Sequence, residues 1–392
     1  MAVKLVLTQI MKNESHVAKR MLDSIKSIVD GICVVDTGST DDSIEIVKKW
    51  GEENGIETYV FERPFDNFEN SRNYSFEKAR EIFLSKKDGH RYYNFWLDFD
   101  EQLVIDKTFN KQSINRDLYM FNTAIGHMKY TRNEMVRLDM DFSFYGPIHE
   151  YIIPPKDTKI TSDVLQGVMV DVKMDGGSWK EDLQMKYISH AHVLEKYISN
   201  NRKDPRWIFY TAQSYHDSAV IKDNREENEE RLRRALRYYK ERVDRTDGYP
   251  EERFYSQFRI GTIMRNLEEP WNLTLQALLK AYSIEPTRGE SIKTIIDHYL
   301  QMGEWHLAYM YSDFALNNFH GKNPYPKKLL FIDDSLYTWK FLEAYSASCY
   351  YTNRKEEAKN SFSKILDIVK TSPEKFSQDD LSKIESNKKF FL

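Results

Sequence analysis

Tyr92-Tyr93-Asn94-Phe95-Trp96-Leu97-Asp98-Phe99-Asp100-Glu101 is a stretch that begins aromatic and ends acidic. Its aromatic half is typical of a strand that is covered on both faces of a parallel sheet. In an extended chain alternate side chains share a face, so we expect Asp98 and Asp100 to point the same way, with Phe99 turned into the core. Neighbouring carboxylates repel each other, and a hard cation such as Mg²⁺ or Mn²⁺ relieves that repulsion. The stretch predicts a buried strand that ends at a cation site; a solvated strand end is the alternative.

The chain before this stretch alternates between strand and helix patterns. Apolar runs predict strands at 3–10, 31–36 and 57–61, and apolar residues at helical spacing follow them. This order predicts an open parallel sheet, in which ligands bind at the carboxyl ends of the strands. Polar clusters lie at three such ends, beginning at Lys12, Asp36 and Asp98. Within the second cluster Ser39 and Asp42 have the spacing of a capping box, which predicts that a helix starts there.

The pattern becomes irregular between residues 103 and 177, and two histidine-bearing segments stand out there and beyond. Ile148-His149-Glu150 follows a Gly-Pro turn, and Ser189-His190-Ala191-His192 comes later.

The chain becomes helical after Asp204-Pro205 and is then rich in Tyr, Ala and Leu. Paired helices are predicted at about 207–245, 253–284, 290–319 and 336–370, with unequal lengths. Such degenerate pairs are typical of tetratricopeptide-like (TPR-like) solenoids, which bind partners on a concave face. We therefore expect two domains, an α/β domain at 1–204 and a helical domain at 205–392.

The composition excludes several classes of protein. A net charge of −4 argues against a globally basic nucleic-acid binder, and 41% apolar residues argue against disorder. The two cysteines do not suggest a disulfide framework or a zinc site. The first apolar run is short and polar-interrupted, and no segment is long enough to span a membrane. We expect a cytoplasmic protein without a membrane partner, in the host cytoplasm if a phage encodes it.

Four motifs, in this order, resemble those of family-2-like glycosyltransferases with the GT-A fold. They are Met11-Lys12-Asn13-Glu14, Val34-Val35-Asp36-Thr37-Gly38-Ser39-Thr40-Asp41, Ser71-Arg72-Asn73 and Trp96-Leu97-Asp98-Phe99-Asp100-Glu101. The likeness covers about residues 3–195. Together with the TPR-like tail it resembles a branch found in bacteria and large tailed phages, some members of which glycosylate peptides.

The resemblance implies roles for residues on the donor side of the site. Asp36 would contact the base or ribose of a nucleotide-sugar, with Gly38 and Ser39 in the turn beneath it. Arg72 would face the diphosphate, and Asp98 would lie at the junction of donor and metal. The donor is most simply a UDP-sugar.

The resemblance also implies a metal site and a base. Asp98 and Asp100 would hold Mn²⁺ or Mg²⁺, and His190 would close the metal site, with His192 as its rival. Glu150 would be the catalytic base that takes the proton of the acceptor. Phe99 departs from the small residue that the family more often has between the two aspartates, without touching the carboxylates.

These implications predict a metal-dependent, inverting glycosyltransferase with a macromolecular acceptor on the helical domain. A hydroxymethylated base in phage DNA is slightly favoured over a peptide or protein, because it fits the phage-like resemblance and a predicted helical segment could supply the basic strip that DNA needs. The strip consists of Arg231, Arg233, Arg234, Arg237, Lys240, Arg242 and Arg245. Partners of these residues at i−4, such as Glu227, weigh against DNA.

Two other functions stay open. One is a scaffold in which the helical repeats bind partners and the first domain has decayed. The other is a nucleotidyltransferase, although residues 9–15 lack the glycine-rich phosphate loop of that class. The identity of the sugar, the nucleotide, the acceptor and the oligomeric state is left open by the sequence.

Overall fold

The computed structural model describes residues 2–126, 128–177, 182–200, 204–219, 225–321 and 330–391. It divides the chain into two compact units, Met1–Asn200 and Asn201–Leu392. Residues 220–224, which belong to the first predicted helix pair, lie outside the described residues. The division into functional domains at residue 204 stays a prediction.

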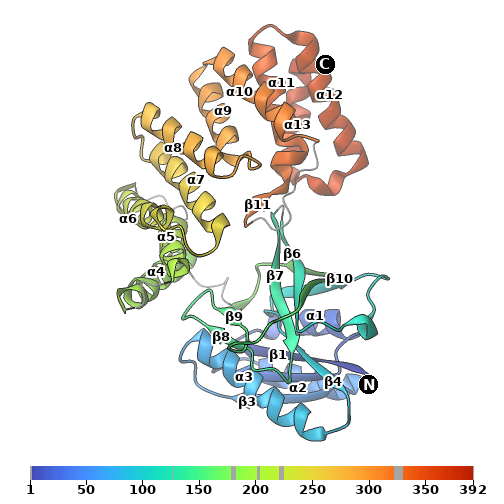
Figure 1. The fold of residues 1–392 in the computed structure, drawn as a ribbon. Helices are drawn as coiled ribbons and strands as arrows, with labels where there is room; N and C mark the ends of the chain where they lie inside the picture. The colour runs from blue at the N-terminus through green and yellow to red at the C-terminus, as the bar shows by residue number, and fades with distance from the viewer. Residues whose placement is uncertain are drawn as a thin grey trace. The chain divides into compact units, whose positions relative to one another are not determined.

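The first unit is built on a twisted sheet with the strand order β3-β2-β1-β4-β7-β6-β10-β5 (Figure 1). Its first four strands run parallel, as the sequence predicts: β1 (Val3–Met11), β2 (Gly31–Asp36), β3 (Glu57–Glu62) and β4 (Arg91–Phe95). All six residues of β2 are buried, which explains why this strand reads as an uninterrupted apolar run.

Helices cover both faces of these parallel strands. They are α1 (Ser15–Ile25), α2 (Ser43–Asn54) and α3 (Phe68–Phe83). Met21 of α1 and Trp50 of α2 pack on one face with Leu7, whereas Phe83 of α3 packs with Val6 on the other. Val6 and Leu7 are adjacent in β1, so the alternation of a strand feeds two separate cores.

The remaining strands extend the sheet with mixed pairing. They are β5 (Glu101–Ile105), β6 (Leu118–Ile125), β7 (Met128–Arg137) and β10 (Ser162–Val172). β7 pairs antiparallel with β4 and with β6, and β6 pairs parallel with β10. A separate hairpin of β8 (Ser143–Tyr145) and β9 (Tyr151–Ile153) lies before β10, and α4 (Leu183–Asn200) ends the unit. This mostly parallel order confirms the predicted GT-A-like sheet.

The acidic end of the stretch at 92–101 is not extended, and that prediction is wrong. β4 ends at Phe95, and β5 begins at Glu101. The Glu101 amide donates to the Asp98 carbonyl oxygen at 3.0 Å, which closes a turn between the two strands. Phe99 is nevertheless buried in the core, as expected.

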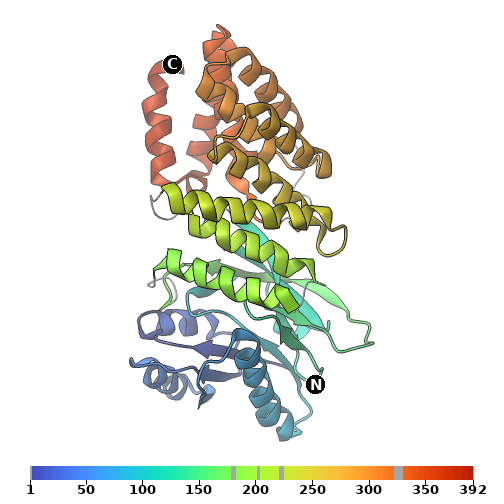
Figure 2. The same cartoon turned by 90° about the vertical axis from the view of Figure 1, so that its left-hand side faces the viewer.

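The second unit is a succession of helices, each packed against the next (Figure 2). Its helices are α5 (Pro205–Ala219), α6 (Arg225–Asp244), α7 (Pro250–Asn266), α8 (Trp271–Ile284), α9 (Glu290–Met302), α10 (Trp305–Asn318), α11 (Phe341–Tyr351), α12 (Lys355–Thr371) and α13 (Gln378–Phe391). Small residues allow close crossings: a Cβ on Gly261 would lie 2.4 Å from the Leu278 side chain. The predicted TPR-like helical region is confirmed, and α13 extends it beyond the predicted pairs.

Candidate functional site at the carboxyl ends of the strands

Asp36 lies at the carboxyl end of β2 and organises the loop that follows. Its Oδ2 accepts hydrogen bonds from the backbone amides of Gly38 at 3.0 Å and Ser39 at 2.9 Å. Gly38 has a φ of 111°, a conformation that favours glycine. Asp36 is only 2% exposed, and its Oδ1 is buried without a hydrogen-bond partner. A buried acceptor of this kind is suited to a ligand's N–H or O–H group.

The loop after β1 is tied to the loop after β2. The Asn13 amide donates to Ser39 Oγ at 2.9 Å, and Asn13 Oδ1 accepts from the Thr40 amide at 2.8 Å. Two polar clusters that are far apart in the sequence therefore meet at one edge of the sheet. This juxtaposition agrees with the expectation from parallel strand order.

Arg72 joins two of the predicted site residues. It lies on α3, where its Nε donates to Glu150 Oε1 at 2.5 Å and its Nη2 donates to Asp98 Oδ1 at 2.8 Å. The side chains of Arg72 and Glu150 are each only 11% exposed. The sequence predicted that Arg72 faces a diphosphate but did not predict this double ion pair.

Opposite charges determine the protonation of this cluster. Burial would lower the pKa of Arg72, but Asp98 and Glu150 outweigh it and raise that pKa. Burial likewise would raise the pKa of Asp98, but Arg72 and then Arg132 outweigh it and lower that pKa. Asp98 is therefore a carboxylate and Arg72 a guanidinium at neutral pH.

The β8–β9 hairpin carries Glu150 and is clamped to α3. Asn73 accepts from the Phe144 amide at 2.7 Å and donates to the Phe144 carbonyl oxygen at 2.9 Å. His149 has a φ of 55°, which is uncommon for a residue with a side chain. The motif Ser71-Arg72-Asn73 thus supplies both the cation beside Glu150 and the anchor of its hairpin.

Three carboxylates approach one another near the predicted metal site. Burial raises the pKa of Glu14, the Gly177 amide opposes this, and Asp100 and Asp98 add to the rise. A Cβ on Gly176 would lie 3.0 Å from the Asp100 Cβ and 3.4 Å from Glu14 Oε2. Such a set of oxygen donors fits a hard divalent cation in kind. The described residues nevertheless contain no group of three or more His, Cys, Asp or Glu arranged to hold a metal.

His190 and His192 differ in their surroundings. His190 lies on α4, and its ring is 6.2 Å from that of His149, with its Nδ1 buried and without a hydrogen-bond partner. Burial and the nearby Lys186 lower the pKa of His190 to about 4, so its imidazole is neutral at pH 7. His192 is exposed. His190 is the better candidate for a ligand, and its role stays a prediction.

The basic strip on α6 and its neighbouring turn is largely neutralised. Five of its seven members form ion pairs: Arg231 with Glu227, Arg233 with Glu229 and Glu269, Arg234 with Glu230, Arg242 with Glu252, and Arg245 with Asp247. Arg242 is also completely buried, and its Nη2 donates to the Tyr249 carbonyl oxygen at 2.8 Å. Among the described residues, Arg237 and Lys240 are the two strip members without an ion pair.

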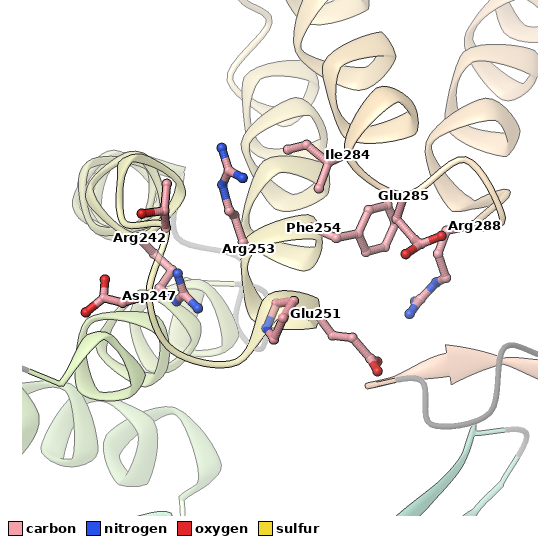
Figure 3. Close-up of a pocket in the computed structure, with 10 residues that line it drawn as sticks. Arg242, Asp247, Glu251, Arg253, Phe254, Ile284, Glu285 and Arg288 are labelled. Carbon is pink, nitrogen blue, oxygen red and sulfur yellow. The ribbon is translucent and has the colours of Figure 1, made fainter.

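A cavity of about 190 Å³ lies in the same unit, where α6, α7 and the end of α8 meet. Acidic and basic side chains are interspersed around it (Figure 3). The charged residues are Arg242, Asp247, Glu251, Arg253, Glu285 and Arg288. A cavity of this mixed character does not select for a phosphate chain, which favours a surface of one sign.

Comparison with known proteins identifies the first unit. Residues 10–107 match the model for glycosyl transferase family 2. The first unit contains a family 2 glycosyl transferase domain. The matched region includes Asp36, Arg72, Asp98 and Asp100, whereas Glu150 and His190 lie outside it. The resemblance of the four motifs is thereby confirmed.

Two curated relatives match a longer stretch of this chain than the family model does. The SPbeta prophage-derived glycosyltransferase SunS of Bacillus subtilis (strain 168) and glycosyltransferase SunS of Bacillus phage SPbeta are each 21% identical over 244 residues. The match covers 59% of this chain and 53% of each relative. The chain therefore spans about half the length of the curated relatives that it matches.

Solved structures are less similar in sequence to this chain than the curated relatives are. TarS 1–349 of S. aureus is 12% identical with a TM-score of 0.35, over 69% of this chain and 91% of that chain. YrrB, a TPR protein, is 16% identical with a TM-score of 0.28, over 50% of this chain and 93% of that chain. Such scores do not establish a common fold, and the architecture of the family 2 domain rests on the strand order described above. No helix among the described residues is long and apolar enough to cross a membrane.

Several residues at the site of the family 2 domain were not predicted from sequence. Asn73 stands inside a recognised motif, but no local signal shows that it clamps a hairpin. Arg132 and Glu134 lie in the irregular region, where the sequence has no motif at all. Arg132 contacts Glu101, and Glu134 contacts Arg132; the first of these contacts joins residues 31 positions apart, which a local pattern does not encode.

Proposed function

We propose that the protein is a metal-dependent, inverting glycosyltransferase that moves a sugar from a nucleotide-sugar to a polypeptide held by the helical unit. The observation that carries this proposal is the family 2 domain, whose matched region includes Asp36, Arg72, Asp98 and Asp100. The ion pairs of Arg72 support it, because they join Asp98 on the donor side to Glu150 on the acceptor side.

The donor would be bound at the ends of β2 and β4. Asp36 would offer its unpartnered Oδ1 to the base or ribose, with the turn at Gly38 and Ser39 holding it in place. A UDP-sugar is the first choice of donor. Asp98 and Asp100 would hold Mn²⁺ or Mg²⁺, with His190 completing the ligand set. When bound, such a cation neutralises the charge that develops on the leaving diphosphate.

The chain's own residues would position the acceptor and remove its proton. Glu150 Oε1 accepts the hydrogen bond of Arg72, so Oε2 is the oxygen that would take the proton of the attacking group. Arg72 fixes this carboxylate relative to Asp98, which belongs to the donor side. Attack on the face of the sugar opposite to the leaving group inverts the anomeric configuration.

The state of the basic strip favours a polypeptide acceptor over the DNA base that the sequence slightly favoured. Neutral i,i+4 pairs on a helix contribute to the helix and leave little charge to release counterions from a phosphate backbone. The mixed cavity in the same unit suits a chain that carries both signs of charge (Figure 3).

A screen of donors tests the proposal. Purified protein is incubated with UDP-, GDP- and dTDP-sugars in Mn²⁺, Mg²⁺ or EDTA, and both the thermal midpoint and released nucleotide are measured. We expect one nucleotide class to raise the midpoint and to be hydrolysed slowly, with both effects lost in EDTA. Binding and release that are unchanged in EDTA would contradict metal dependence. A complete lack of binding to any donor would favour the scaffold alternative.

A further inference from the structure

A chain of three charged side chains, of which the two carboxylates are buried and Arg132 is 30% exposed, lies beneath the turn that carries Asp98. Glu101 is 2% exposed and Glu134 is 1% exposed. Arg132 lies between them: its Nη2 donates to Glu101 Oε1 and Oε2, both at 2.6 Å, and its Nε forms an ion pair with Glu134. Glu101 begins β5, whereas Arg132 and Glu134 belong to β7.

Glu101 holds the Asp98 turn through both its side chain and its main chain. Its Oε2 accepts a hydrogen bond from the Asp98 amide at 2.9 Å, and its own amide donates to the Asp98 carbonyl oxygen at 3.0 Å. Two residues before Asp98, the Trp96 amide donates to the Glu134 carbonyl oxygen at 3.2 Å. The backbone on each side of Asp98 is thus fixed by the same three-residue network.

The physical character of this network argues for a role in geometry. Burying an ion group is costly, and well-packed apolar side chains often stabilise a fold equally well. What an ion-paired carboxylate with hydrogen bonds to both of its oxygens, such as that of Glu101, adds is one defined orientation. Here that orientation is passed to Asp98, whose carboxylate is held on its other side by Arg72 at 2.8 Å.

We propose that Glu101, supported by Arg132 and Glu134, is a positioning residue that orients Asp98 toward the cation and the donor diphosphate. The role rests on the proposed function, because it assigns Asp98 to metal and donor binding. Residues that orient metal ligands typically change metal affinity or activity 10- to 100-fold when they are altered.

The test is a titration of the full-length protein with Mn²⁺, followed by electron paramagnetic resonance, beside the thermal midpoint. Glu101→Gln keeps the size of the side chain and removes its charge, so the amide no longer satisfies both Arg132 and the Asp98 amide. We expect about 10- to 100-fold weaker Mn²⁺ binding with a folded protein. Arg132→Met should show a similar loss, and Arg132→Lys should recover part of it.

The matched control is Arg137→Met. Arg137 lies on the same strand and pairs with Asp117 and Asp139, away from Asp98. This variant should bind Mn²⁺ as the unaltered protein does. Equal Mn²⁺ affinity in Glu101→Gln and the unaltered protein overturns the positioning role. If Glu101→Gln does not fold, Glu134→Gln replaces it, and an unchanged affinity in that variant overturns the role equally.

Hydrogen exchange separates failure of this role from failure of the proposed function. If the unaltered protein binds neither Mn²⁺ nor any nucleotide-sugar, the proposed function has failed. Exchange of the Asp98 amide should still be at least tenfold faster in Glu101→Gln than in the unaltered protein, because its acceptor is weakened. If that exchange rate is unchanged, Glu101 does not hold the turn and the inference is wrong.

Discussion

At the scale of single residues, Arg72 has a task that an ammonium group cannot perform. Its planar guanidinium reaches Glu150 and Asp98 from two different nitrogens. A lysine keeps the charge but offers one point donor in place of the fork. We expect Arg72→Lys to lower kcat about 100-fold, since a displacement of about 1 Å at a reacting group has that effect.

Steady-state kinetics with the identified donor measure this effect. Arg63→Lys is the matched control, because Arg63 pairs with Asp66 at 3.0 Å in a partly exposed position before α3. It should leave kcat unchanged. Equal kcat values for Arg72→Lys and the unaltered protein would show that the fork does not position Glu150.

The contribution of Glu150 to turnover should be separable from donor binding. The proposed base acts on the acceptor, so Glu150→Gln should lower kcat by about 10²- to 10⁴-fold and leave donor affinity within about twofold. Single-turnover kinetics give the first quantity, and a calorimetric titration with the nucleotide gives the second. The control is Glu81→Gln, because Glu81 is an exposed residue of α3 that forms an ion pair with Lys78. An active Glu150→Gln beside an inactive variant of another carboxylate would assign the base elsewhere.

At the scale of elements, one aspartate joins the starts of two helices. Asp41 Oδ1 accepts from the Ser43 amide at 3.1 Å at the start of α2, and Oδ2 accepts from the Ser15 amide at 3.1 Å at the start of α1. The predicted capping box of Ser39 and Asp42 is wrong: Ser39 Oγ accepts from the Asn13 amide, and Asp42 makes no side-chain cap.

The pH dependence of the free energy of unfolding should reveal the contribution of the Asp41 carboxylate. Burial opposes ionisation, but hydrogen bonds from Ser43 and Ser15 outweigh it and lower the pKa of Asp41 to about 2. Because the folded pKa lies below the unfolded value of about 3.9, the stabilisation is present above pH 4 and is lost as pH falls toward 2. Asp41→Asn should lower the free energy of unfolding by about 1 kcal/mol at pH 7.

Urea unfolding at pH 7 and at several values below pH 4 measures both quantities. The difference between Asp41→Asn and the unaltered protein should shrink toward acid pH. Asp42→Asn is the neighbouring control and should change stability by less than about 0.5 kcal/mol. A difference that is independent of pH would mean that Asp41 acts through packing and not through its charge.

Elements with a local cause could be predicted from the sequence, and long-range contacts could not. β2 is apolar throughout, so its place in a buried sheet follows from its pattern, as does the polar loop after it. The end of β4 at Phe95 depends instead on a turn that Glu101 closes with its side chain. Arg72 and Glu150 are 78 positions apart in the sequence, and no local sequence pattern predicts their ion pair.

At the scale of the whole molecule, each unit has its own core and its own charge pattern. In the first unit, carboxylates surround Arg72. In the second unit, most residues of the basic strip form ion pairs with acidic residues of the same unit. The net charge of −4 adds no general attraction for nucleic acid. These properties lead us to expect that the acceptor is recognised by shape and local polar contacts, not by a field of positive charge.

Salt and two charge reversals distinguish the acceptor classes in the full-length protein. A DNA acceptor with six to ten phosphate contacts would lose about 10³- to 10⁵-fold in affinity between 50 and 200 mM salt. Transfer to a polypeptide should change by less than about threefold. Arg237→Glu with Lys240→Glu reverses the two strip residues that lack an ion pair among those described, so this pair of changes should leave polypeptide modification intact. The control is Arg233→Glu, which disrupts ion pairs with Glu229 and Glu269 without touching those two residues. A steep fall of transfer with salt that the double reversal makes shallower, or a loss of transfer in the double reversal but not in the control, would favour DNA as the acceptor, because only a phosphate acceptor would need those two charges.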